Sequence, residues 1–274
     1  MKSLIVKNLS ASYIKKEVLC DISFSLQQGG FVCLCGPNGA GKSTLLSLLA
    51  GVGDSGLKAG GDIFISDDDG QSKNIIQFSR HELARTIAYL QQNEYSEWNF
   101  LVRDYVLQGR YAWTKSSLFG AGPANYAAAD YEVVDGVLGE LGLSDFSQRY
   151  IHELSGGEFQ KIRLARALAQ TPRFLLLDEP AANLDYVFEP HLMQLLANTA
   201  HKKNLGILAA VHDINLAARF ADKILLLPPA AVTANSKKSV LFGSPSDIMN
   251  TDNLKYTFGV DFECKEIKSF QSLQ

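Results

Sequence analysis

Apolar residues occur along this chain in short continuous runs that alternate with stretches of helical periodicity. Every residue of Phe31–Cys35 is apolar, as expected for a strand that is buried on both faces. Similar runs occupy residues 174–177, 206–211 and 223–227, and helical stretches separate them. Such an order is typical of a mostly parallel sheet that helices cover on both sides. The pattern therefore predicts an α/β fold.

The first 26 residues follow a different pattern. Apolar residues occupy alternate positions in short runs, as at Leu4 and Val6 and again at Ile22, Phe24 and Leu26. An alternation of period two predicts strands that bury only one face. We expect these strands to form a small antiparallel sheet at the periphery of the parallel one.

The middle of the chain carries helical periodicity. Residues 125–141 have apolar side chains at helical spacing, and Gly142 follows them as a terminator. Glycines and a proline at 120–123 break the chain before this helix, and residues 67–70 and 228–238 are expected to be surface loops. The predicted organisation is a single domain over residues 1–274, with an α/β core and its antiparallel part at 1–92 and 171–243, a helical subdomain at 93–170 and a C-terminal tail at 244–274.

The composition limits the classes of function. The chain has 274 residues, of which 46% are hydrophobic and 20% charged, and a formal net charge of −3. It therefore lacks the basic surface that binds nucleic-acid phosphate, and nucleic acid is not an expected partner. No apolar run approaches the roughly 18 residues needed to cross a bilayer, and the first eight residues are too polar for a secretory signal. We expect a cytosolic location.

Neither the four cysteines nor the five histidines have the spacing of a metal site. There is no Cys-x-x-Cys pair, and Cys33 and Cys35 alternate into one face of an apolar strand, so buried free thiols are expected. The histidines are scattered along the chain. We therefore predict no zinc site.

A glycine-rich segment joins the strand at 31–35 to a predicted helix at 43–50. It fits the phosphate-binding loop pattern, in which glycines let successive backbone N–H groups wrap phosphates. Lys42 would supply a positive charge to the β and γ phosphates, and Ser43 would bind Mg²⁺ through its hydroxyl. A flexible glycine turn is the alternative, but it leaves the flanking strand and helix unexplained. The predicted nucleotide-binding residues are Gly36, Pro37, Asn38, Gly39, Ala40, Gly41, Lys42, Ser43 and Thr44.

The second motif is a pair of acidic residues at the end of the apolar run at 174–177. Asp178 and Glu179 follow that run, at the edge of an open α/β sheet where ligands bind. Asp178 would hold the Mg²⁺ shell, and Glu179 would orient or deprotonate the water that attacks the γ-phosphate. The alternative is that two acidic residues end a strand and contact only solvent. The phosphate-binding loop favours the catalytic interpretation.

Ser155, Gly156, Gly157 and Glu158 precede a predicted helix. Locally, Ser155 with Glu158 is a capping box. The segment also has the form of the signature motif of the ABC ATPase family, which this sequence resembles over nearly its whole length. That family often has Gln where this chain has Glu158. The resemblance implies that Ser155, the two glycines and the helix dipole face the γ-phosphate of a nucleotide held by the other subunit of a dimer.

The same resemblance assigns four further residues. Tyr13 matches the aromatic that stacks on adenine, although packing is the commoner role for such a residue. Gln92 matches the glutamine that senses Mg²⁺ and links the site to the membrane partner; the family has Pro where Gln91 stands. Asp185 matches a loop that crosses the dimer, with a helix N-cap as the alternative. His212 matches the histidine that contacts the γ-phosphate.

The resemblance also implies fold and mechanism. The expected fold is a P-loop NTPase (RecA-like) core of mostly parallel sheet, with a small N-terminal antiparallel β subdomain and an inserted α-helical subdomain. The expected mechanism is hydrolysis of ATP, with Mg²⁺, between two copies paired head to tail. The implied partners are a second copy of the chain, integral membrane permease subunits and, indirectly, a substrate-binding protein. The implied location is the cytoplasmic side of the inner membrane, as a peripheral protein.

Two looser matches indicate a narrower group. Residues 102–111 and 242–260 resemble importers of iron-siderophore complexes, haem or vitamin B12. Tyr95, Trp98 and Phe100 would form part of a cleft for a membrane-subunit helix, with burial in the insertion as the alternative. Other readings are an importer of another small solute, a non-transport ABC ATPase of repair, translation or iron-sulfur assembly, a kinase, or a binding module without hydrolysis.

Overall fold

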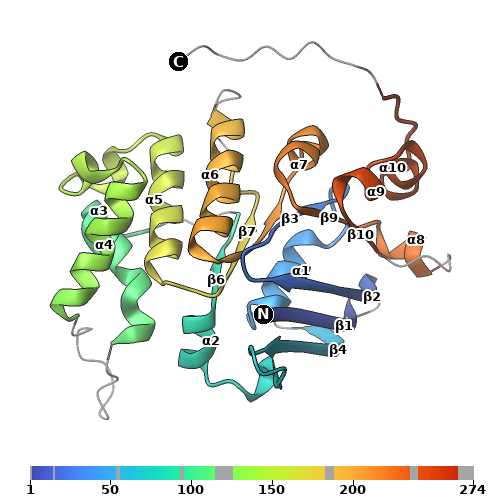
Figure 1. The fold of residues 1–274 in the computed structure, drawn as a ribbon, viewed down its shortest axis with the longest axis horizontal. Helices are drawn as coiled ribbons and strands as arrows, with labels where there is room; N and C mark the ends of the chain where they lie inside the picture. Colours follow the sequence, from blue (N-terminus) through green and yellow to red (C-terminus); the bar gives the residue numbers. More distant parts are fainter. Residues whose placement is uncertain are drawn as a thin grey trace.

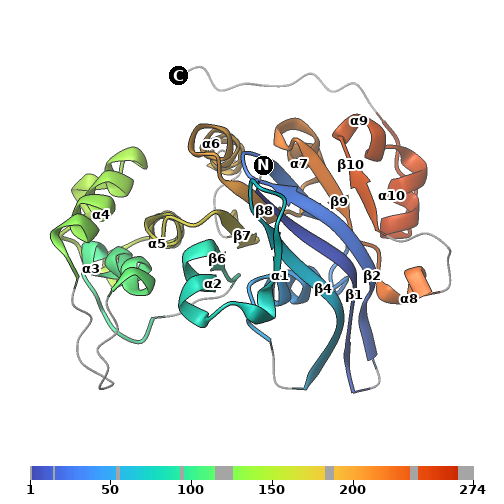
Figure 2. The same ribbon diagram turned by 60° about the horizontal axis from the view of Figure 1, so that its bottom comes forward.

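The computed structural model describes residues 2–14, 16–53, 56–92, 96–114, 126–182, 188–234 and 240–264. A six-stranded sheet runs through the centre of the molecule, with strand order β10-β9-β3-β8-β7-β6 (Figures 1 and 2). Five of the strands are parallel, and β10 pairs antiparallel with β9 at one edge. The strands are β3 (Phe31–Cys35), β6 (Ile87–Leu90), β7 (Phe174–Asp178), β8 (Gly206–Ala210), β9 (Lys223–Leu226) and β10 (Leu241–Gly243).

The second sheet is antiparallel, with strand order β2-β1-β4-β5. Its inward face carries the alternating apolar residues predicted from the sequence: Leu4 lies opposite Leu26 and Val6 opposite Phe24, and all four are buried. These side chains belong to an apolar cluster that also contains Val32 and Leu34 of β3, and this packing attaches the sheet to the core. Its strands are β1 (Ser3–Tyr13), β2 (Lys16–Gln27), β4 (Leu57–Ser66) and β5 (Ser72–Asn74). The two sheets together confirm the predicted α/β class and the N-terminal antiparallel part.

Helix α1 (Lys42–Leu49) lies between the two sheets. Leu45, Leu46 and Leu49 are fully buried in an apolar cluster that includes residues of both sheets. The opposite face of the six-stranded sheet is covered by α6 (Phe188–Lys203) and α7 (Ile214–Phe220), which are visible beside it in Figure 1. A strand between two apolar layers has no polar face, and this explains why β3 is apolar at every position.

The described residues between β6 and β7 are mostly helical. Helices α3 (Val102–Leu107), α4 (Ala128–Glu140) and α5 (Gly156–Ala169) lie together on one side of the molecule in Figures 1 and 2. Helix α4 lies within the stretch 125–141 that the periodicity predicted. The contact between η2 (Gln108–Trp113) and α5 requires Gly109, since a Cβ there would lie 2.2 Å from the carbonyl oxygen of Arg166. The subdomain boundaries at 93 and 170 stay predictions.

Several shorter elements were not expected from the sequence. Helix α2 (Arg80–Thr86) begins with a capping box between Ser79 and Glu82, and α9 (Pro245–Ile248) and α10 (Thr251–Phe258) follow β10. The prediction of a surface loop at 228–238 was wrong for part of the segment, because residues 230–234 form α8 (Ala230–Ala234).

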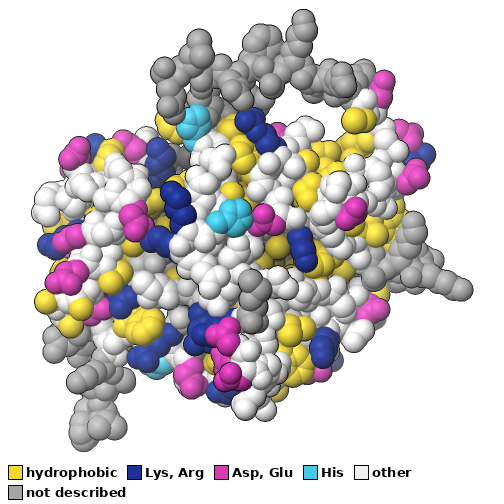
Figure 3. All heavy atoms as spheres, viewed as in Figure 1, with side chains coloured by type: hydrophobic (Ala, Val, Ile, Leu, Met, Phe, Trp, Pro, Cys, Tyr) yellow, Lys and Arg dark blue, Asp and Glu magenta, His cyan; other side chains and the backbone are white. Residues whose placement is uncertain are grey.

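The surface and the cysteines add three findings. Cationic and anionic side chains are interspersed over the face drawn in Figure 3. Cys33 and Cys35 are buried as predicted, but Cys20 is half-buried and Cys264 is exposed. Among the described residues, no helix combines the length and the apolar character that a membrane span requires.

Candidate functional site

The strand order places the polar motifs of the chain next to one another. Parallel strands end at the same edge of a sheet, and β3, β8, β7 and β6 are consecutive neighbours in this one. Their registers are nearly level, since Ala210 of β8 pairs with both Leu34 and Asp178, and Leu177 pairs with Leu90. Four separate segments therefore meet at this edge: the loop at 36–41, His212, Asp178 with Glu179, and Gln92.

The loop after β3 depends on glycine at two points. A Cβ on Gly36 would lie 2.3 Å from the carbonyl oxygen of Leu227, so only glycine allows this close approach. Gly41 has a φ of 95° and lies against Val18 and Leu19 of β2. The loop is thus held between the end of β9 and strand β2, and α1 begins directly after it. Its backbone conformation is therefore set before any ligand binds.

Lys42 is buried inside this loop. Its Nζ donates to the carbonyl oxygens of Gly36 at 2.9 Å and Pro37 at 3.2 Å, and the residue is only 6% exposed. Burial lowers the pKa of the ammonium, while the carboxylates of Glu179 and Asp178 act in the opposite direction. The loop thus holds a partly desolvated cation at its centre, which is a strong site for an anion.

Asp178 is the most buried carboxylate of this edge, at 2% exposure. Burial raises the pKa of Asp178, although the hydrogen bond donated by the Ser43 hydroxyl lowers it in part. Among the residues that the structure describes, none donates a hydrogen bond to its Oδ1. A buried carboxylate oxygen that lacks a donor, next to a hydroxyl, is a donor set that suits a hard cation such as Mg²⁺. The residues present therefore fit the predicted ion.

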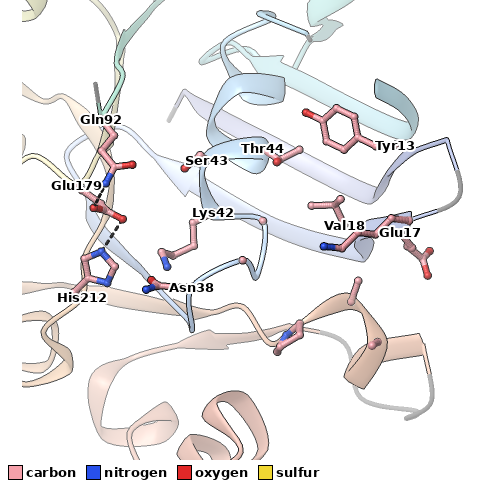
Figure 4. A pocket seen from close by; sticks show the side chains of 16 residues that line it. Tyr13, Glu17, Val18, Asn38, Lys42, Ser43, Thr44, Gln92, Glu179 and His212 are labelled. Atoms are coloured by element: carbon pink, nitrogen blue, oxygen red, sulfur yellow. Dashed lines mark hydrogen bonds and ion pairs between the residues drawn. The ribbon is translucent and has the colours of Figure 1, made fainter. Parts of the chain in front are cut away.

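Glu179 lies at the meeting point of three strand ends, as Figure 4 shows. Gln92 donates from Nε2 to Oε2 of Glu179, and Nε2 of His212 lies 2.6 Å from Oε1. The backbone of Glu179 has a φ of 51°, a left-handed conformation that is unfavourable for a residue with a side chain. The backbone of Glu179 is thus strained, and the contacts with Gln92 and His212 hold its carboxylate in a fixed position.

These residues line a pocket of about 1020 Å³. The phosphate-binding loop, Gln92, Glu179 and His212 form one end, and Tyr13 lies at the other. The residues predicted to act on the phosphates and the aromatic residue predicted to stack on adenine thus line one cavity. The lining also includes residues that the sequence reasoning missed, namely Lys16, Glu17, Val18, Pro229, Ala230 and Ala231.

The segment 155–158 does not line this pocket. Ser155 is exposed and caps α5: its Oγ accepts from the N–H of Glu158 at 3.3 Å and donates to Oε2 of Glu158 at 2.7 Å. The N–H of Ser155 also donates to that carboxylate, at 2.8 Å. These bonds confirm the predicted capping box, and they lower the pKa of Glu158. Asp185, the other residue expected to act across a dimer, lies outside the described residues, as does Tyr95.

Two buried side chains of α5 join this helix to the pocket, and sequence reasoning missed both. Gln160 donates to the carbonyl oxygen of Pro180 at 2.8 Å and accepts from Arg163 at 2.6 Å. Arg163 also donates to the carbonyl oxygens of Gln91 and Gln92. Arg163 is only 4% exposed, and the signal that could have found it is an arginine on the apolar face of the helix. Helix α5 thus holds the segments that carry Gln92 and Glu179.

Comparisons with known proteins agree with this geometry. Residues 19–182 match the family model described as ABC transporter. The chain is 34% identical to the hemin import ATP-binding protein HmuV of Bordetella pertussis, over 94% of this chain and 93% of that protein. It is 33% identical to the cobalamin import ATP-binding protein BtuD of Halobacterium salinarum, over 94% of this chain and 61% of that protein.

A solved structure shows the same fold. It is a metal-chelate type ABC transporter in an inward-facing conformation, which superposes with a TM-score of 0.76 at 28% identity and covers 95% of this chain and 90% of its own.

Proposed function

Because this chain belongs to the ABC transporter family, we propose that it is the ATP-hydrolysing subunit of an importer that takes up an iron-siderophore complex, haem or vitamin B12 through separate membrane subunits. The observation that carries the proposal is the convergence of the phosphate-binding loop, Glu179, His212 and Gln92 on one pocket, with Asp178 buried beside Ser43 at the same edge of the sheet. The names of the hemin and cobalamin relatives support the cargo class.

The phosphate-binding loop would hold the triphosphate. Its glycines leave backbone N–H groups available to the phosphates, and the start of α1 adds the positive end of a helix dipole. On binding, the ammonium of Lys42 would exchange its bonds with the Gly36 and Pro37 carbonyls for bonds with phosphate oxygens. A phosphate oxygen is a charged acceptor, so this exchange favours binding.

Glu179 is the proposed catalytic base. It would orient the attacking water and accept its proton, while His212 and Gln92 fix the direction of its carboxylate. Asp178, Ser43 and Gln92 would hold Mg²⁺, which when bound neutralises charge on the phosphates. Tyr13 would stack on adenine at the far end of the pocket.

The site proposed here is complete only in a dimer. Ser155 and Gly156 are exposed and lie outside the pocket of their own chain, which supports their use on the nucleotide of a second copy. A head-to-tail pair would sandwich two nucleotides, and Asp185 would lie across the dimer.

The proposed organisation of the chain is a helical subdomain at residues 93–170, a core at 1–92 and 171–243, and a tail at 244–274.

Transport would proceed by closure and reopening of this dimer beneath the permease, at the cytoplasmic side of the membrane. ATP binding would favour the closed pair, and removal of the γ-phosphate would favour the open one. A substrate-binding protein would deliver the cargo to the permease and would not contact this chain. Trp98, which is 72% exposed, is a candidate contact for the permease.

Reconstitution with the permease tests the proposal. The chain and its membrane partner are placed in vesicles with ATP and Mg²⁺, and uptake of a ferric siderophore, haem and cobalamin is measured. We expect one of the three to accumulate as ATP is hydrolysed. Hydrolysis with uptake of none of them would refute the cargo class, and absence of hydrolysis would refute the ATPase assignment. Failure to co-purify with any membrane protein would favour a non-transport ATPase.

A further inference from the structure

The connection between β9 and β10 is longer than the strands require. Leu226 pairs with Leu241 in an antiparallel register, which places Leu227 opposite Val240. A two-residue turn is enough to join strands in this register. Residues 228–239 stand there instead, and they include α8 (Ala230–Ala234). The sheet itself gives no reason for the added chain, so we looked for its purpose in what α8 contacts.

The added segment starts next to the phosphate-binding loop. The N–H of Leu227 donates to the carbonyl oxygen of Cys35 at 2.8 Å, and the carbonyl oxygen of Leu227 lies where Gly36 leaves room for it. Pro228 and Pro229 follow, and their rings restrict the backbone as it leaves the sheet. The N–H of Val232 then donates to the carbonyl oxygen of Pro229 at 2.8 Å. Only Pro228 and Pro229 separate Leu227 from α8, so α8 begins close to the loop.

Helix α8 forms part of the pocket wall. Pro229, Ala230 and Ala231 line the same cavity as Tyr13 and Val18, and α8 packs against β2. In Figure 4 Tyr13 lies on one side of the cavity and the α8 turn, in faint orange, on the other, with Val18 between them in this view. The residues that α8 gives to the wall are small and apolar, so they form a surface that suits the flat apolar face of an aromatic base.

We infer that Pro229–Ala231 form a second wall of the nucleobase site, which contacts the base on the side away from Tyr13. This inference rests on the proposed function, because it requires that the pocket takes ATP. The phosphates are held at the other end of the cavity, by the loop and Lys42. The α8 wall therefore contributes to affinity for the base and not for the triphosphate.

A chain that lacks α8 tests whether affinity for the base and affinity for the triphosphate are separate. Residues 228–239 are replaced by Asn-Gly, the pair preferred in a two-residue hairpin between Leu227 and Val240. The dissociation constants of ATP and of inorganic tripolyphosphate are then measured. We expect ATP to bind about tenfold more weakly and tripolyphosphate to bind unchanged. An unchanged ATP affinity would overturn the inference. Failure of the unaltered chain to bind either ligand would instead refute the proposed function.

Two point variants decide the matter if the shortened chain has lost tripolyphosphate binding and so its fold. Ala231→Trp places an indole on the pocket wall, and Val232→Trp places one at the next residue, which does not line the pocket. We expect ATP to change the fluorescence added by Ala231→Trp, tripolyphosphate to leave it unchanged, and Val232→Trp to respond to neither. Equal responses of the two variants, or none with ATP, would contradict a wall at α8.

Discussion

The edge of the six-stranded sheet and the start of α5 both carry polar and charged residues, but these residues differ in burial and in hydrogen bonding. At the edge, Lys42 and Asp178 are buried, and one carboxylate oxygen of Asp178 accepts no hydrogen bond from the described part of the chain. At the start of α5, Ser155 and Glu158 satisfy each other, and Ser155 is exposed. The first region bears the cost of desolvated charge before any ligand binds. The second is an ordinary stable helix cap.

This difference indicates where ligand binding changes the protein. Burial without a partner is unfavourable unless a ligand later supplies one, so the edge is organised for phosphate and cation. A capping box is stable alone and can remain intact when a partner docks on it. We therefore expect the chemistry to take place at the edge and the helix start to recognise a second copy. Variants at the edge, at the start of α5 and at the contact between them therefore have different expected effects.

The largest effect is expected from Glu179→Gln. The amide retains the size of the side chain and a bond with His212, but it cannot accept a proton from water. We expect turnover to fall by about 10²–10⁴-fold while ATP affinity changes little. Single-turnover hydrolysis and equilibrium nucleotide binding measure the two quantities. Ordinary hydrolysis by this variant would remove Glu179 from its assigned role.

Asp178→Asn separates function from stability at the same edge. Because burial raises the pKa of Asp178, its charged form lowers the stability of the fold at pH values above that pKa. We expect the variant to lose Mg²⁺-dependent hydrolysis and, without nucleotide, to melt about 2–4 °C higher at pH 7. The gain should shrink as the pH falls towards 3.8, the ordinary value. A lower melting temperature at pH 7 would show that the carboxylate stabilises the fold.

Arg163→Met loosens the connection between the two regions. The change leaves the carbonyl oxygens of Gln91 and Gln92 without their buried donor. We expect kcat to fall about tenfold, the ATP dissociation constant to stay within about twofold, and the unfolding free energy to fall by about 1–3 kcal/mol. Arg163→Lys, which retains a donor, should recover part of the rate. Equal losses in both variants would indicate a purely structural role.

The smallest effect is expected from Glu158→Gln. The amide retains an acceptor for the N–H of Ser155, so hydrolysis should change less than about twofold. Because the cap lowers the pKa of Glu158, its contribution to stability is present above 4.5 and is lost as the pH falls through the lowered value. Thermal melting of both proteins at low and neutral pH checks this. A pH-independent difference between them would contradict the assignment.

Local patterns predicted most of the edge. Glycine spacing predicted the loop at 36–44, and apolar runs that end in Asp178 or precede His212 predicted which residues meet at the carboxyl ends of the strands. The capping box was predicted because it involves residues only three apart. These features depend on neighbours in the sequence, or on the rule that parallel strands end at one edge.

The features that sequence reasoning missed depend on tertiary packing. Arg163 stands on the apolar face of its helix, but only the position of α5 against Gln91 gives it a role. Residues 228–234 read as a loop because two prolines precede a short run of alanines. Their place in the pocket follows from the contact between Gly36 and Leu227, which no local pattern contains. The prediction that Ser155 acts across a dimer came from family resemblance alone.

Crosslinking between two copies tests the central claim, that Ser155 serves the nucleotide of a second chain. Asn38→Cys and Ser155→Cys are introduced, both at exposed positions, with Cys20→Ser and Cys264→Ser to remove the other accessible thiols. Glu179→Gln is added to retain ATP, and a short bis-maleimide is applied. We expect crosslinked dimers joined through positions 38 and 155 with ATP and none without it. Crosslinks only within single chains, or none with ATP, would contradict it.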